Sequence, residues 1–343
     1  MPDRPWIRSR RAVLGQLLGA AGAALALPAR AQPITLKFAT ALPPGNPIAT
    51  IYDPWVKAVN EAAQGEFQIQ VVPGPTFASA TNVWDRTVAG VADIGLIVLP
   101  QAGRPFPKSS VTLLPLGVDD CELGAAALWR LFAKGLIADE FSDVKLLHMA
   151  PVPATGLLSK APITKLQDLK GQKIRAADKF SSDALSALGA APIAVPFSES
   201  YQALSRGVVS AAIANPYSVT AFKLGEVAKH YTGTVSFGMV PSAVVMNKQA
   251  YDKLSAKGKA VIDRFTGEEA SRLTGRGHNR LGEAIWTDIK AKGEHTFHVL
   301  PPPEVAQWQK ALESVKAAWL AETPNGKAVH DSFLADYAAA RKP

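Results

Sequence analysis

The side chains that most often perform catalysis are scattered along this sequence of 343 residues. It contains no Walker-type phosphate loop, no Gly-x-Ser-x-Gly nucleophile motif and no His-Glu-x-x-His zinc motif. His295 and His298 are the only close pair of histidines, and we expect a surface pair because no third ligand stands at metal-ligand spacing. A hydrolase that uses Ser181, Ser182 or Ser198 with a distant histidine is the alternative. The sequence therefore predicts a protein that is not an enzyme and holds neither metal nor cofactor.

Short β-type runs alternate with helical patterns over much of the chain. The predicted strands are Leu36–Ala39, Phe67–Val71, Ile94–Leu99, Val144–Ala150, Lys173–Ala176, Ile193–Val195 and Ala211–Ala214, and the predicted helices are Ile48–Ala63, Val83–Ala89, Glu122–Lys134, Ser182–Leu188 and Glu199–Arg206. This alternation predicts an α/β fold with mainly parallel sheets covered by helices. Helical spacing continues over residues 255–292 and Glu304–Trp319. A helix of about 20 residues is roughly 30 Å long, enough to bridge two domains.

The amino-terminal residues have the order of a secretory signal peptide. Arg10 and Arg11 precede an apolar run over residues 14–27, and small residues follow up to Ala31. We predict a signal peptide over residues 1–31, with the paired arginines indicating the twin-arginine route. A permanent membrane anchor is the alternative, but the run is shorter than the roughly 20 apolar residues that a span needs. We therefore expect a periplasmic protein that does not span the membrane when mature.

Composition excludes several other classes of protein. Cleavage after Ala31 removes five arginines and one aspartate, which lowers the formal net charge from +8 to +4. No Lys/Arg run with interleaved aromatic residues predicts nucleic-acid binding. Cys121 is the only cysteine, so neither an intramolecular disulfide nor a thiol metal cluster can form. The roughly 312 remaining residues exceed one typical core, which indicates two domains or one large α/β unit.

One stretch, residues 163–175, reads Ile-Thr-Lys-Leu-Gln-Asp-Leu-Lys-Gly-Gln-Lys-Ile-Arg. The further motifs are Leu188–Pro192, Val195–Leu204 and Gly207–Val209, with Leu36–Ala39, Gly90–Gly95, Val111–Pro115, Phe222–Lys229 and Met246–Lys248 elsewhere. In these motifs the sequence resembles the extracytoplasmic solute receptors of tripartite ATP-independent periplasmic (TRAP) transporters, the DctP family. The resemblance covers nearly the whole mature chain. It implies a two-lobed periplasmic-binding-protein fold, type II-like, with an interdomain cleft for the ligand and a long bridging helix.

The resemblance also implies how the lobes divide and what the protein does. Lobe I would comprise residues 32–153 and 241–280, and lobe II residues 154–240 and 281–343. The receptor would capture a small organic carboxylate and deliver it to a permease that has a small and a large membrane subunit. A receptor that serves an ATP-driven importer or a sensor kinase is the alternative.

The ligand-binding residues are likewise carried over from the family. The resemblance implies that Arg175 binds the ligand carboxylate, and a guanidinium suits this because it stays charged when desolvated and offers two parallel donors. Without the family motif, Arg175 would be interpreted as an ordinary surface arginine. Phe197 lines the pocket in relatives, although the sequence alone favours a core phenylalanine. Asn215 and Tyr217 match a loop that contacts ligand in relatives; a simple turn at Pro216 is the alternative.

This sequence departs from relatives that bind sialic acid. The position of their second arginine is Thr155, and the lobe I positions read Ala41, Ser79, Val98 and Gln101. A second ligand carboxylate, buried without a partner, would cost several kcal/mol. We therefore predict a monocarboxylate with an apolar or aromatic body, such as an aromatic or 2-oxo/2-hydroxy acid. A dicarboxylate or sugar acid is the alternative, and whether a metal bridges ligand and protein stays open, although no carboxylate cluster requires one.

Overall fold

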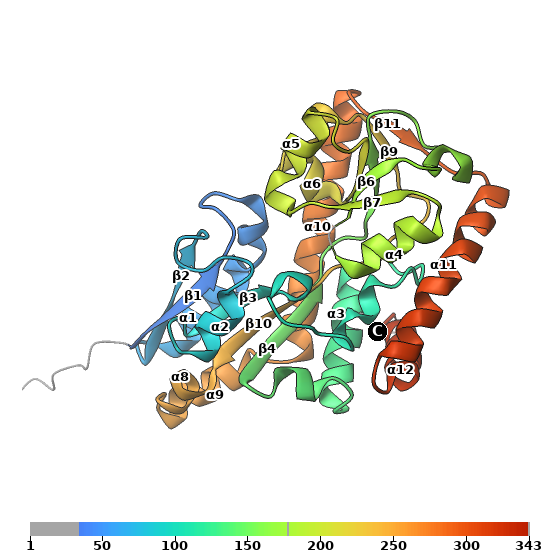
Figure 1. Cartoon of the computed structure of the whole chain (residues 1–343). Coiled ribbons are helices and arrows are strands. Elements are labelled where there is room, and N and C mark those ends of the chain that lie inside the picture. Colours follow the sequence, from blue (N-terminus) through green and yellow to red (C-terminus); the bar gives the residue numbers. More distant parts are fainter. Residues whose placement is uncertain (1–33, 177, 342–343) are drawn as a thin grey trace, which may run out of the picture. The chain divides into compact units, whose positions relative to one another are not determined.

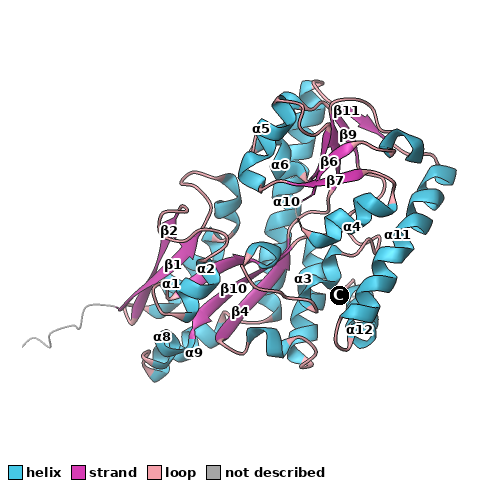
Figure 2. Cartoon of the chain, in the orientation of Figure 1, coloured by secondary structure: helices cyan, strands magenta, loops and turns pink. Residues whose placement is uncertain are grey.

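The computed structural model describes residues 34–176 and 178–341, which fold into two mixed β-sheets flanked by helices (Figures 1 and 2). The predicted signal peptide, residues 1–31, lies outside the described residues. No helix of the described ranges combines the length and the apolar character that a membrane span requires.

The first sheet has the strand order β2-β1-β3-β10-β4. Its strands are β1 (Ile34–Thr40), β2 (Phe67–Pro73), β3 (Ile94–Val98), β4 (Val144–Pro151) and β10 (Pro241–Asn247). Strand β1 runs parallel to both β2 and β3, whereas β10 is antiparallel to both β3 and β4. The carboxyl ends of β1, β2 and β3 therefore meet at one edge of this sheet.

The second sheet has the order β11-β9-β5-β8-β6-β7. Its strands are β5 (Gly156–Ser159), β6 (Lys173–Ala176), β7 (Ala191–Ala194), β8 (Ala211–Ala214), β9 (His230–Thr232) and β11 (Thr296–His298). Strand β6 is parallel to β7 and β8, and β5 is antiparallel to β8 and β9. The prediction of mainly parallel sheets is wrong for β5 and β10, which run antiparallel to the strands beside them. Each of these is the first strand after the chain passes from one sheet to the other, and it enters antiparallel to its neighbours.

Helices cover the two sheets and connect their strands. They are α1 (Asp53–Ala63), α2 (Val83–Val88), α3 (Cys121–Ala133), α4 (Lys179–Ala187), α5 (Ser200–Ser205), α6 (Pro216–Thr220), α7 (Leu224–Val227), α8 (Lys248–Asp252), α9 (Ala256–Arg264), α10 (Glu268–Lys292), α11 (Pro302–Glu322) and α12 (Gly326–Ala339). Short 3₁₀ helices are η1 (Pro47–Ile51), η2 (Leu99–Gln101), η3 (Ser109–Leu113), η4 (Ala138–Phe141), η5 (Leu166–Leu169) and η6 (Phe197–Glu199). Helix α11 packs on α4, and α12 packs on α3 (Figure 1).

Two chain segments pass between the sheets side by side, one between β4 and β5 and the other between β9 and β10. The Val152 N–H donates to the Val240 carbonyl at 2.9 Å, and the Phe237 N–H donates to the Thr155 carbonyl at 3.0 Å. Backbone hydrogen bonds therefore hold the two crossing segments together as a narrow antiparallel ribbon. The division of the chain into lobes at these segments and within α10 stays a prediction.

Helix α10 is the third connection, and its amino-terminal half packs tightly on α3. A Cβ atom on Gly275 would lie 2.4 Å from the carbonyl oxygen of Cys121, the buried first residue of α3. The carboxyl-terminal half of α10 reaches the second sheet, where Ile289 belongs to the same apolar cluster as Leu158 of β5 and Ala212 of β8. Helix α10 is thus the long bridging helix that the sequence predicted.

Candidate functional site

Three predicted site residues lie at one edge of the second sheet. Arg175 is the third residue of β6, Phe197 follows β7, and Asn215 directly follows β8. These strands are neighbours and run parallel, so their carboxyl ends share this edge. Ligands of open α/β sheets bind beyond such carboxyl ends. The edge is therefore the candidate ligand site.

Arg175 is a buried cation, with only 3% of its surface exposed. Its Nε donates to the Val195 carbonyl at 3.0 Å, and no ion pair joins it to a carboxylate of the described residues. Burial lowers the pKa of the guanidinium to about 10, and the negative charge of Asp178 opposes this shift. Arg175 still carries its charge at neutral pH, so the site offers a desolvated cation to an incoming anion.

Phe197 lies against Arg175 and supplies an apolar surface beside its charge. The guanidinium carbon is 4.9 Å from the centroid of the Phe197 ring, a cation–π contact. The ring of Phe222 stands almost perpendicular to that of Phe197, with centroids 4.4 Å apart and an interplanar angle of 87°. No role for Phe222 was predicted from the sequence, although Phe222 begins the family motif Phe222–Lys229. An aromatic residue that follows a predicted site loop was the available signal.

Asn215 caps α6 and keeps part of its amide available. Its Oδ1 accepts from the Ser218 N–H and from the Ser218 hydroxyl, both at 3.1 Å. Among the described residues the Asn215 Nδ2 has no hydrogen-bond partner, so this amide can donate to a ligand. The cap thereby fixes the direction of the side chain.

Tyr217 is buried and its hydroxyl contacts α10. The hydroxyl lies 2.9 Å from His278 Nδ1 and donates to the His278 carbonyl at 3.2 Å. Within the described ranges, the structure brings Arg175 and Phe197 together but shows no ring contact between Tyr217 and either of them. A ligand contact by Tyr217 stays a prediction.

Thr155 lies in the crossing segment that follows β4, and it is buried. Its N–H and its hydroxyl both donate to the Gly238 carbonyl, at 3.1 Å and 3.2 Å. The side chain at this position therefore ties the two crossing segments together. Its contact with ligand stays a prediction as well.

The four lobe I positions gather at the carboxyl edge of the first sheet. Ala41 follows β1, Ser79 lies in the loop after β2, Val98 ends β3, and Gln101 ends η2. A Cβ atom on Gly103 would lie only 2.8 Å from the Thr81 carbonyl oxygen, so the loops that carry Ser79 and Gln101 touch through their backbones. The glycine permits this close approach.

Comparison with known proteins identifies the family. Residues 38–323 match the DctP family, described as bacterial extracellular solute-binding protein, family 7. The chain belongs to this family.

Relatives of this DctP-family chain include characterised and solved proteins. The C4-dicarboxylate-binding periplasmic protein DctP of Rhodobacter capsulatus is 28% identical, in an alignment that covers 89% of this chain and 92% of that protein. A TRAP solute-binding protein of Bordetella bronchiseptica with bound (R)- and (S)-mandelate is 25% identical, with a TM-score of 0.80 and coverage of 90% of this chain and 99% of that chain. A TRAP solute-binding protein of Rhodoferax ferrireducens with copurified benzoate is 23% identical, with a TM-score of 0.83 and coverage of 90% of this chain and 99% of that chain. The predicted two-lobed TRAP receptor fold is confirmed.

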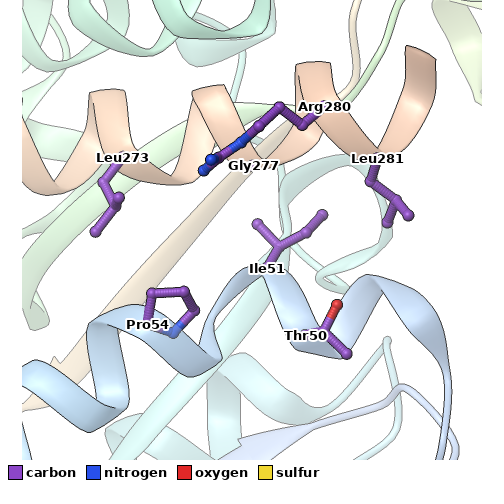
Figure 3. Close-up of a pocket in the computed structure, with 7 residues that line it drawn as sticks. All are labelled: Thr50, Ile51, Pro54, Leu273, Gly277, Arg280 and Leu281. Carbon is purple, nitrogen blue, oxygen red and sulfur yellow. The ribbon is translucent and has the colours of Figure 1, made fainter. Parts of the chain in front are cut away.

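Within the described residues of this DctP-family chain, two of the cavities lie outside the Arg175 group, by which we mean Arg175 and Phe197. One, of about 290 Å³, lies between η1 and the start of α1 on one side and α10 on the other (Figure 3). It is lined by Thr50, Ile51, Pro54, Leu273, Gly277, Arg280 and Leu281. The second, of about 360 Å³, is lined by Tyr201, Ala221, Phe222, Lys223 and Glu226. Neither is lined by Arg175, and the second is lined by Phe222, whose ring contacts Phe197.

A buried polar cluster lies where α10 meets β4. His148 and His278 are fully buried, and the ring of Tyr52 lies near both, at 6.4 Å and 6.2 Å between centroids. Burial lowers the pKa of each histidine to about 3. The fold therefore holds both rings neutral at the pH of the periplasm.

This cluster predicts a loss of stability in acid. An unfolded histidine has a pKa near 6.5, so between about pH 6.5 and pH 3 the unfolded chain binds more protons than the folded one. The free energy of unfolding should therefore decrease as the pH is lowered from 6.5 to 3. The decrease is up to about 1.4 kcal/mol per pH unit for each histidine. His148→Leu should reduce this slope by one histidine's share in urea unfolding at pH 4, 5 and 6. An unchanged slope would show that His148 does not contribute.

Proposed function

We propose that this DctP-family receptor binds a small organic monocarboxylate with an apolar or aromatic body in the interdomain cleft. The observation that carries the proposal is Arg175, a buried cation with no carboxylate partner among the described residues, packed on the ring of Phe197. A ligand carboxylate would supply the missing charge, and its two oxygens fit the guanidinium fork. The Asn215 amide would donate to the same ligand.

The loops at the lobe I edge support a single charge on the ligand. Residues 41–52, 74–82 and 99–107 contain no acidic residue, and their only cation is Arg104. Arg104 already lies 3.4 Å from Asp143 and 4.7 Å from the centroid of the Trp84 ring. A second ligand carboxylate would therefore meet no free cation in these loops, whereas an apolar body would meet neutral and aromatic side chains.

The relatives support the same class of ligand and keep one alternative open. Mandelate and benzoate, which solved relatives carry, each combine one carboxylate with an aromatic ring. The curated Rhodobacter capsulatus relative is named for C4-dicarboxylates, so a dicarboxylate is the second candidate. The neutral lobe I loops favour the monocarboxylate.

The proposal extends to the role of the receptor in transport. The chain acts by binding and release rather than by catalysis, and delivers its ligand to a TRAP permease with a small and a large membrane subunit. Ligand contacts that form only when the lobes close would favour the closed form, which the permease accepts. Export by the twin-arginine route would place the mature chain in the periplasm.

A screen of acids tests this proposal directly. Purified mature protein should be stabilised against heat by benzoate, mandelate or a 2-oxo acid, and calorimetry should give one site per chain. Mass spectrometry should recover the bound acid chemically unchanged. Strong stabilisation by succinate or sialic acid, with none by the monocarboxylates, would contradict the proposed ligand class. Turnover of the acid would contradict the role as a receptor.

A further inference from the structure

Phe222 connects the Arg175 group with the second cavity. On one side its ring contacts Phe197, whose ring lies under the Arg175 guanidinium. On the other side Phe222 lines the cavity of about 360 Å³, together with Tyr201 and Glu226. Of the described residues that line this cavity, Phe222 alone makes a ring contact with Phe197. The side chain thus stands between the candidate site and an empty volume.

The turn that carries Phe222 is held in place. The Phe222 N–H donates to the Tyr217 carbonyl at 3.3 Å, and the Tyr217 hydroxyl is fixed to His278 of α10. The next residue, Lys223, has φ of 59° and ψ of 16°, a left-handed conformation that few residues other than glycine adopt. The ring of Phe222 is therefore presented by an anchored turn rather than by a free loop end.

The cavity beyond Phe222 can accept the end of a longer ligand. Its volume is within the range of small-molecule sites, which begins near 300 Å³. Two polar groups of its wall pair with each other, because the Tyr201 hydroxyl donates to Glu226 Oε2 at 3.1 Å. The third, Lys223, is exposed to solvent. An apolar chain could therefore lie along Phe222 and Ala221 while the Tyr201–Glu226 pair stays intact and Lys223 keeps its charge in solvent.

We propose that Phe222 sets the length of the acids that the receptor accepts, by closing the Arg175 site against this cavity. The inference rests on the proposed function, because it places the carboxylate on Arg175 and the apolar body along Phe197. Removal of the Phe222 ring joins the two spaces. Short aromatic acids then lose a contact surface, and longer acids gain room for their extra methylene groups.

Calorimetric titration of a series of acids tests the inference. The probes are benzoate, phenylacetate, 3-phenylpropanoate and 4-phenylbutanoate, which differ by single methylene groups. Wild type should prefer the shorter acids. Phe222→Ala should weaken benzoate binding and shift the affinity ratio of 4-phenylbutanoate to benzoate by about tenfold or more, the usual effect of a methylene-sized change in an apolar pocket. Phe222→Leu, which keeps an apolar side chain, should shift the ratio less and provides a second variant if the alanine protein folds poorly.

Tyr201→Ala is the matched control, because Tyr201 lines the same cavity and, among the described residues, makes no ring contact with Phe197. It should keep the wild-type order of the four acids. If wild type binds short acids and both Phe222 variants keep its order, the length role is wrong while the proposed function stands. If wild type binds mandelate or a 2-oxo acid but none of the four acids, the length role is wrong while the proposed function stands. If it binds no monocarboxylate of either series, both fail.

Discussion

Arg175→Ala should weaken carboxylate binding by about a thousandfold, which corresponds to about 4 kcal/mol of binding free energy. The physical reason is that the ligand carboxylate would be buried without its cation. Arg175→Lys should retain part of the affinity, since the charge remains but the paired donors are lost. Calorimetry with the best acid from the screen measures both variants.

Thermal stability without ligand separates binding from folding. Arg175 is a desolvated cation without an ion pair to the described residues, so its removal should leave the melting temperature of the free protein little changed. Lys173→Ala is the matched control, because Lys173 is an exposed cation on the same strand. It should leave both affinity and melting temperature unchanged. Undiminished affinity in Arg175→Ala would contradict the role given to this residue.

Gly275→Ala should lower the free energy of unfolding by about 2 kcal/mol, because overpacking against backbone costs about 3 kcal/mol and alanine regains about 1 kcal/mol in a helix. The new Cβ would lie 2.4 Å from the Cys121 carbonyl oxygen and 2.6 Å from the Glu122 Cα. Both are backbone atoms of α3, so α10 as a whole must move away. This cost should exceed the gain of about 1 kcal/mol that alanine brings to a helix over glycine.

Gly277→Ala is the matched comparison on the same helix. Its Cβ would lie 2.8 Å from a side-chain atom, Ile51 Cγ2, while the nearest backbone atom, Ile51 Cα, is at an ordinary contact distance of 3.8 Å. A side chain yields more readily than backbone, so Gly277→Ala should lower the free energy of unfolding less than Gly275→Ala does. Urea unfolding followed by circular dichroism measures both variants. An unchanged free energy of unfolding in Gly275→Ala would show that α10 and α3 are not tightly packed at this position.

Strands and helices with clear periodicity could be predicted from the sequence, and others could not. The alternating run at Phe67 and the helix that ends at Ala63 are present, but the predicted helix at Ile48–Ala63 divides into η1 and α1. Pro54 explains the division, since it has no N–H for a continuing helix and suits a first turn. Strand β10 escaped prediction because all seven of its residues are buried, which removes the alternation.

The candidate site was predictable only where a motif marked it. Arg175, Phe197 and Asn215 lie together at one sheet edge, because each ends or follows one of three adjacent parallel strands. Tyr217 shows the limit of such reasoning. It lies only two residues after Asn215, but it is part of the short helix α6, and its hydroxyl contacts His278 of α10. Phe222 was missed because its contact with Phe197 joins residues 25 positions apart, and only its position after the predicted site loop pointed to it.

The single cysteine makes this receptor a convenient scaffold for an optical reporter. Cys121 is buried at the start of α3, and burial together with Asp119 and Asp120 raises the pKa of its thiol far above the usual range. A protonated, inaccessible thiol does not react with maleimide dyes. A fluorophore could therefore be attached at one engineered cysteine, such as Ser198→Cys next to Phe197, without first removing the native thiol.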